Sequence, residues 1–255
     1  MKDQQKQDIL VQAYYLDEAS TEASIINTDS FYSDLSAINT YELKIYNSAG
    51  ELISKSTYTL DQKSQLTINI EKYCKGKEKS CFGIFTLEKT DGIANGHFYT
   101  TISDKNSGNQ FKIHSHQKYS PSSNSLTSPI KHLIKFYLLP GRTIDDQAWR
   151  RLALPRFTRS EINGKQLIIF NKSSRPDNIT IRTISSPNDS HLTYLNFLSR
   201  ETKCIELQSL LPSQTIDNTM AAYEIDLHSR LGGVSLKPIL INKNKSSHLE
   251  GINHT

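Results

Sequence analysis

The sequence contains few of the residues that most directly reveal a protein's class. Three cysteines in 255 residues, Cys74, Cys81 and Cys204, exclude a framework of several disulfide bonds. Cys74 and Cys81 bracket the charged stretch 75–80 and are able to close a small loop in an oxidising compartment. Free thiols in a reducing compartment are the alternative that we favour, because cytosolic proteins rarely keep disulfide bonds.

Long apolar runs are also missing from the chain. Residues 1–7 are polar and no long apolar stretch follows them, so the chain as given shows no signal peptide. No segment approaches the length of a membrane span, and we expect none. These features favour a cytoplasmic location without identifying the compartment.

Motifs that announce an enzymatic activity are absent as well. The sequence holds no nucleophile elbow, P-loop, Gly-x-Gly-x-x-Gly or Cys-x-x-Cys. Glycoside hydrolysis needs two convergent carboxylates, and nothing selects one pair among the 26 Asp and Glu residues. We therefore assign no catalytic residue and no cofactor, and favour a protein that is not an enzyme. Nucleic-acid binding is disfavoured because the net charge is only +4 and the basic residues are not interleaved with several aromatics.

The 3.6-residue apolar period of a helix is missing too, and the pattern that is present predicts strands. Short apolar or alternating segments are separated by Gly, Asn, Ser and Pro, which is typical of an all-β protein. Gly50 lies between two such segments and predicts a β-hairpin turn. The predicted strands lie within 9–16, 36–47, 52–60, 66–70, 82–87, 97–103, 111–113, 132–139, 160–171, 179–184, 192–198, 204–207, 223–227 and 234–241.

A twelve-residue motif occurs twice, and it suggests an internal duplication. Residues 36–47 and 160–171 share six identities at an offset of 124 (160 − 36), and similar strands follow each copy in the same order. We predict two tandem, related β-sandwiches of immunoglobulin-like or similar topology. The first covers 1–119, a Ser/Pro-rich linker covers 120–129, and the second covers 130–255, with a polar tail over 242–255 that we interpret as an edge strand followed by disorder.

The densest cluster of chemically specific residues lies in 141–159, a predicted crossover loop. It contains the only tryptophan, Trp149, and five arginines, four of which are candidate ligand-binding residues. Arginine forks bind carboxylate, phosphate or sulfate bidentately, and an indole ring stacks on a sugar. The candidate ligand-binding residues are Arg142, Trp149, Arg150, Arg151 and Arg156. A purely structural role is the alternative, with Trp149 as a core anchor and the arginines in surface ion pairs.

The corresponding segment of the first half, 17–29, is acidic and is also predicted to be a loop. Residues 1–130 carry 13 Lys and no Arg against 15 acidic residues, whereas residues 131–255 carry 17 basic against 11 acidic residues. Oppositely charged loops suggest that the two halves, or two copies of the chain, dock through them. The sequence therefore permits a homo-oligomer.

His114 and His116 form a His-x-His pair, whose imidazoles lie on one face of an extended strand. That spacing is usable for a metal and resembles the His-x-His of cupins, but the Glu that follows in that family is replaced by Gln117-Lys118. Solvated histidines are the interpretation that we favour, and no metal is assigned.

Together these patterns favour a non-enzymatic binding or assembly module. We expect its basic Arg/Trp loop to contact a protein partner or an anionic glycan. Two alternatives stay open. One is a carbohydrate-active enzyme or its accessory domain, and the other is a self-assembling structural subunit.

Overall fold

The structure is a computed structural model that divides into two compact units, Met1–Pro121 and Ser122–Thr255. The residues that it describes are 8–14, 19–27, 39–61, 64–74, 82–89, 96–114, 117–119, 150–151, 162–171, 173–186, 189–211, 223–229, 238–243 and 249–254. The predicted linker 120–129 lies outside these residues and stays a prediction, although the division between the units falls within it.

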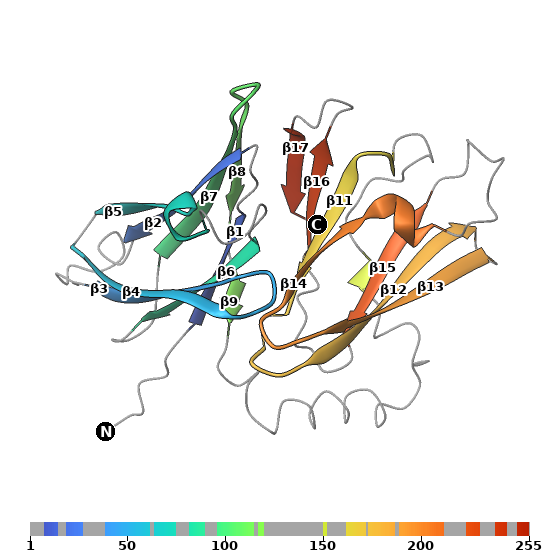
Figure 1. Cartoon of the computed structure of the whole chain (residues 1–255), viewed down its shortest axis with the longest axis horizontal. Coiled ribbons are helices and arrows are strands. Elements are labelled where there is room, and N and C mark those ends of the chain that lie inside the picture. Colours follow the sequence, from blue (N-terminus) through green and yellow to red (C-terminus); the bar gives the residue numbers. More distant parts are fainter. Residues whose placement is uncertain are drawn as a thin grey trace. The chain divides into compact units, whose positions relative to one another are not determined.

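The first unit is built from antiparallel strands in two sheets (Figure 1). Strand order is β4-β3-β6-β1-β9 in one sheet and β5-β2-β7-β8 in the other. The short helix α2 (Glu71–Cys74) follows β5. The strands are β1 (Asp8–Tyr14), β2 (Ala19–Asn27), β3 (Asn39–Tyr46), β4 (Leu52–Leu60), β5 (Gln65–Asn69), β6 (Phe82–Lys89), β7 (Gly96–Asp104), β8 (Gln110–His114) and β9 (Gln117–Tyr119).

The second unit is also all-β and antiparallel, again with two sheets. The strand orders are β10-β15-β12-β13 and β14-β11-β16-β17, and a short 3-10 helix, η2 (Leu207–Leu210), follows β14. The strands are β10 (Arg150–Arg151), β11 (Lys165–Phe170), β12 (Asp177–Ser186), β13 (Asp189–Phe197), β14 (Thr202–Glu206), β15 (Glu224–Ser229), β16 (Ile239–Lys243) and β17 (Leu249–His254). The prediction of an all-β protein is confirmed, and β17 is the edge strand expected in the polar tail.

Alternation of side chains explains why these segments form strands. Along β3, Tyr41, Leu43 and Ile45 are buried, while Glu42 and Lys44 between them are only partly buried on the opposite face. A strand points successive side chains to opposite faces, so one face of β3 packs into the core and the other meets solvent. Burying apolar surface of this kind contributes about 25 cal/mol per Å².

The predicted hairpin between β3 and β4 is confirmed. Its turn contains Gly50 at φ 85°, a left-handed conformation that suits glycine because glycine lacks a Cβ. The amide of Gly50 donates to the carbonyl of Asn47 at 3.0 Å, and the Asn47 side-chain oxygen accepts from the amide of Glu51 at 2.8 Å. The side chain of an asparagine thus closes the turn, as is typical of this residue.

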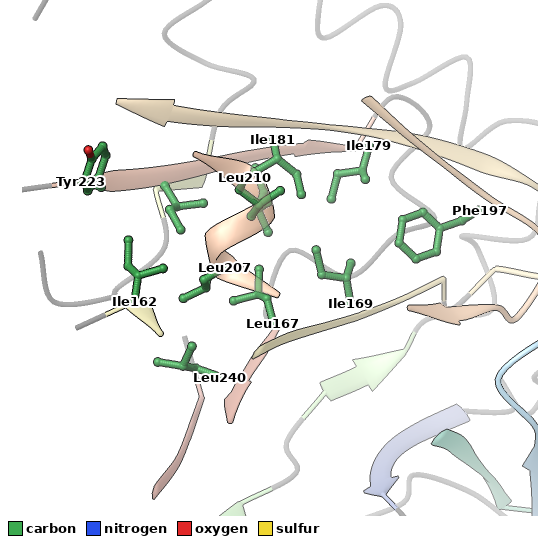
Figure 2. Packing of buried hydrophobic residues seen from close by; sticks show 12 residues of the cluster. Ile162, Leu167, Ile169, Ile179, Ile181, Phe197, Leu207, Leu210, Tyr223 and Leu240 are labelled. Atoms are coloured by element: carbon green, nitrogen blue, oxygen red, sulfur yellow. The ribbon is translucent and has the colours of Figure 1, made fainter. Parts of the chain in front are cut away.

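The core of the second unit is a single cluster that draws on both of its sheets (Figure 2). Ile179 and Ile181 come from β12 in one sheet, and Leu167 and Ile169 come from β11 in the other. Leu207 and Leu210 of η2 belong to the same cluster, and Figure 2 shows the short helix between these two strands. Two sheets whose inner faces share one apolar cluster exclude water between them.

Strand order is the same in the two units. A strand of the second unit corresponds in position to the strand of the first unit whose number is lower by nine. The order β4-β3-β6-β1 therefore corresponds to β13-β12-β15-β10, and β5-β2-β7-β8 corresponds to β14-β11-β16-β17. Among the described strands, only β9 has no counterpart in the other unit.

This order corrects the alignment of the twelve-residue motif. The first copy contains β3 and the second contains β11, but β11 holds the position of β2, and β12 holds the position of β3. In the corresponding register, Tyr41 matches Ile179, an offset of 138 (179 − 41), and Leu60 matches Phe197, an offset of 137 (197 − 60). All four side chains are buried. The offset of 124 therefore compared strands at different positions in the sheets, and they differ in burial: β3 buries alternate residues, whereas β11 buries four consecutive ones, Leu167–Phe170.

Two segments predicted to be loops contain strands. Residues 19–27 of the acidic segment form β2, in which Ala19, Thr21, Ala23 and Ile25 are all buried. The prediction failed because small and polar residues there look like a loop in composition, although alternate ones face the core. The acidic segment is therefore not one exposed loop, and β2 does not support docking between two charged loops.

The predicted strand 132–139 lies outside the described residues.

Candidate functional site

The described part of the predicted arginine cluster is a strand and not a loop. Arg150 and Arg151 form β10, and their positions on the ladder lie opposite Leu227 and Asp226 of β15. The prediction of a crossover loop is wrong for these two residues, because pairing with β15 holds their backbone extended. Arg142, Trp149 and Arg156 lie outside the described residues, so their part in a binding site stays a prediction.

Asp226 connects the arginine strand to the rest of the sheet. Its carboxylate is 2% exposed and pairs with Arg182 of β12, with 2.9 Å between Nη2 and Oδ2. Arg182 lies directly opposite Asp226 on the ladder. A buried carboxylate needs such a partner, because removing an unpaired charge from water is costly. The pairing with Arg182 therefore fixes the carboxylate of Asp226 between β12 and β15.

Four strands bring one residue each into a single line across this sheet. Arg151 lies opposite Asp226, Asp226 opposite Arg182, and Arg182 opposite Leu192 of β13. We call these four residues the cross-strand row. Ile181, the neighbour of Arg182, faces the core, so Arg182 and Asp226 lie on the other face. The row brings two arginine positions, one buried carboxylate and one apolar side chain to neighbouring strands.

The β13 end of the row is apolar and exposed. Leu192 is 40% exposed and Tyr194, on the same face of β13, is 71% exposed. A tyrosine ring exposed to this degree offers an apolar surface and a hydroxyl to a partner. The cross-strand row could offer charged groups to a ligand, and Tyr194 could offer an aromatic ring.

A second polar pair in the same sheet is structural. Asp177 is buried, accepts from the Ser229 hydroxyl at 2.7 Å and accepts from the backbone amide of Asn178 at 2.7 Å. These bonds compensate the carboxylate for its loss of water. We therefore place Asp177 in the scaffold and not in the site.

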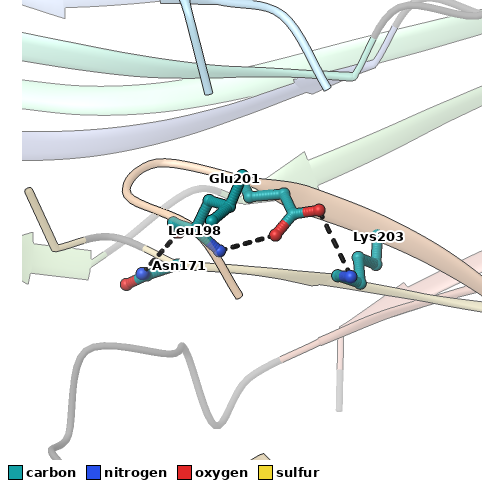
Figure 3. A network of polar contacts seen from close by, with 4 residues as sticks. All are labelled: Asn171, Leu198, Glu201 and Lys203. Carbon is teal, nitrogen blue, oxygen red and sulfur yellow. Dashed lines mark hydrogen bonds and ion pairs between the residues drawn. The ribbon is translucent and has the colours of Figure 1, made fainter. Parts of the chain in front are cut away.

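The last residue of the second motif copy, Asn171, also has a structural role (Figure 3). Its side-chain amide donates to the Leu198 carbonyl at 2.8 Å and to the Arg175 carbonyl at 2.7 Å. Glu201 completes the network by accepting from the Leu198 amide at 2.6 Å and pairing with Lys203 at 3.2 Å. The network fixes the turn between β13 and β14 against the end of β11.

The other residues singled out in the sequence are two histidines and three cysteines. His114 ends β8, and His116 lies outside the described residues. The described parts of the chain hold no group of three or more His, Cys, Asp or Glu placed to bind a metal ion. Cys204 is a free, exposed cysteine, whereas Cys74 ends α2 and Cys81 lies outside the described residues. The pairing of Cys74 with Cys81 stays open.

Sequence reasoning missed Arg182, Asp226, Leu192 and Tyr194. The alternation in 179–184 and 223–227 already predicts that Arg182 and Asp226 lie on the face of their strands that points away from the core. The alternation does not reveal the register that brings the strands together.

No helix in the described ranges has the length and apolar character needed to cross a membrane. Neither the protein-family models nor the curated proteins compared with this chain give a match.

Proposed function

We propose that the protein is a non-enzymatic binding or assembly module made of two tandem, related β-sandwiches. In this proposal, the basic segment 141–159 contacts a protein partner or an anionic glycan. The sandwich form is supported by the two antiparallel sheets of each unit and by the shared apolar cluster of the second. The duplication is supported by the matching strand orders and by the register that aligns buried residues.

The cross-strand row is the observation that carries the ligand proposal. Its residues contribute two positive charges and one negative charge, and the negative charge of Asp226 is already taken up by Arg182. Arg151 therefore adds a basic residue to the edge strand β10, within the arginine-rich segment 141–159 of the sequence. Arginine forks bind carboxylate, sulfate or phosphate bidentately, so this segment favours such ligands.

A binding role is favoured over glycoside hydrolysis by the pairing of Asp226. Its carboxylate is bound by the guanidinium of Arg182 at 2.9 Å, whereas a glycosidase needs two carboxyl groups that converge on the substrate. We therefore assign Asp226 to fixing Arg182. Exposed Tyr194 and Leu192 fit recognition of a partner, since tyrosine is enriched in interfaces.

The test compares single arginine variants that each remove one charge. R150A and R151A change the proposed site, and R175A removes an exposed arginine from a turn elsewhere in the same unit. Heparin serves as the anionic glycan, polyglutamate as a mimic of an acidic protein surface, and dextran as an uncharged polymer. Calorimetric titration at 50 and 300 mM NaCl gives the affinities, and the melting temperature reports folding.

We expect R150A and R151A each to weaken binding of heparin or polyglutamate about fivefold, because one charge-assisted contact contributes about 1 kcal/mol. R175A should leave the affinity within twofold. A preference between the two polymers then separates glycan from protein ligands. Equal losses in all three variants, or no binding of either polymer by the unmodified protein, would contradict the proposal.

A further inference from the structure

Edge strands are where one sheet can recruit another, and two of them in this chain are long. Among the described sheets the edges are β4, β5, β8, β9, β10, β13, β14 and β17. Only β4 and β13 of these have nine residues. Proteins usually protect a long edge with charged side chains, lysine above all, because its unpaired amides and carbonyls are a template for another strand.

The two long edges differ in this protection. β4 carries Lys55, which is bound to Glu42 of β3 at 2.7 Å. The corresponding position of β13 is Leu192, 137 residues later (192 − 55), and β13 contains no Lys or Arg. The residue of β4 that occupies the position corresponding to Tyr194 is Thr57, which is polar. The second unit therefore has an apolar surface at the same edge where the first has a charged one.

The sequence of β13 is complementary to itself in the antiparallel direction. If two copies pair with Thr193 at the two-fold axis, Leu192 of each copy lies opposite Tyr194 of the other. Ser190 then lies opposite Asn196, and no two like charges face each other, because Asp189 lies opposite Phe197. An aromatic side chain opposite an aliphatic one is a stabilising cross-strand pair.

We infer that β13 pairs antiparallel with β13 of a second copy of this chain, centred on Thr193. The pairing joins two four-stranded sheets into one continuous sheet of eight strands. Its backbone hydrogen bonds give affinity, and the Leu192–Tyr194 contacts set the register. Two identical patches meet, so the contact closes on itself as a dimer and does not extend into a filament. The inference goes beyond the proposed ligand binding, since the dimer does not involve segment 141–159.

The first test is the oligomeric state of the whole chain by sedimentation velocity from 2 to 200 µM. A contact confined to one strand buries a small area, so we expect a dissociation constant of roughly 10–100 µM. L192K copies the lysine that β4 carries at this position, and it should weaken the dimer at least tenfold. T57K places the same new charge on β4, at the position that corresponds to Tyr194, and should leave the dimer unchanged.

The second test establishes the register by cross-linking in a C204S background, which removes the exposed free thiol of β14. T193C places two cysteines face to face at the axis, where mild oxidation should join the copies. S190C is the matched control, because its two cysteines lie six residues apart along the paired strands and cannot form a bond. Both variants and the C204S parent are compared on non-reducing gels.

Each outcome has a definite meaning. A dimer that L192K disrupts, T57K spares and T193C traps supports the inference. A monomer at every concentration, a dimer indifferent to L192K, or cross-linking of S190C as fast as T193C would overturn it. Heparin binding by a strictly monomeric protein would leave the ligand proposal standing while refuting this one.

Discussion

Gly164 is the position where a single added methyl group should damage the second unit most clearly. It precedes β11, has φ +77°, and its carbonyl accepts from the Lys243 amide at 2.9 Å. A Cβ built on Gly164 would lie 2.3 Å from the carbonyl oxygen of Lys243. Gly108 provides a matched comparison, because it has φ +72° and a Cβ there would meet no atom within 4 Å.

The cost of each substitution follows from these geometries. A left-handed backbone costs a non-glycine residue about 1–2 kcal/mol, and the loss of freedom in the unfolded chain returns about 0.4–1 kcal/mol. G108A should therefore lower the free energy of unfolding by about 1 kcal/mol. In G164A, the strand pair must also separate and the bond to Lys243 is lost, which adds about 2 kcal/mol. We expect about 3 kcal/mol in total.

Scanning calorimetry and urea unfolding followed by circular dichroism measure these differences. For units of this size, about 3 kcal/mol corresponds to a fall of roughly 10 °C in the melting temperature. Asparagine variants separate the two causes, because asparagine tolerates the left-handed region but still carries a Cβ. G108N should approach the unmodified protein, whereas G164N should stay as unstable as G164A. Equal shifts in G108A and G164A, or rescue by G164N, would refute the reasoning.

Two further predictions concern ionisable groups. Hydrogen bonds from Lys44 and then Lys55 lower the pKa of Glu42 from 4.5 to about 2, so E42Q should cost about 1 kcal/mol at pH 7, as for other surface ion pairs. The folded-state pKa is depressed, so this stabilisation is complete above pH 4.5 and should disappear as the pH falls toward 2, which urea titrations across that range would detect. Desolvation, followed by the charge of Glu206, raises the pKa of the Cys204 thiol to about 11. Iodoacetamide at pH 8 should therefore label Cys204 more slowly in the folded than in the unfolded chain, and equal rates by mass spectrometry would contradict this.

The strands that the sequence predicts best are those with strong alternation and clear turns. β3 satisfies both conditions, because Tyr41, Leu43 and Ile45 recur at every second position and Gly50 supplies the turn into β4. β2 satisfies neither, since three of its four buried residues are Ala or Thr and carry little apolar signal. β10 consists of two arginines, which resemble a loop until pairing with β15 is known. Pairing partners are far apart in the chain, so local pattern does not contain them.

The candidate site illustrates the same division between local pattern and register. Composition alone draws attention to segment 141–159, which holds five of the nine arginines of the chain. Arg182 and Asp226 are 44 residues apart and only their ladder makes them partners at 2.9 Å. A part-buried ion pair formed in this way cannot be recognised from the sequence alone. Its detection depends on knowing that β12 and β15 are neighbours.

The two units differ in polarity along corresponding lines of their sheets. The line of positions in the first unit that corresponds to the cross-strand row is Leu10, Thr86, Lys44 and Lys55. It is apolar at the β1 end and basic at the β4 end, whereas the row of the second unit is basic at the β10 end and apolar at the β13 end. Lys44 and Lys55 of the first unit and Leu192 of the second lie outside the described cores, so this difference does not follow from shared core packing. Under the two proposals above, it corresponds to different partners for the two units, with the arginine segment at one end of the row and β13 open for pairing at the other.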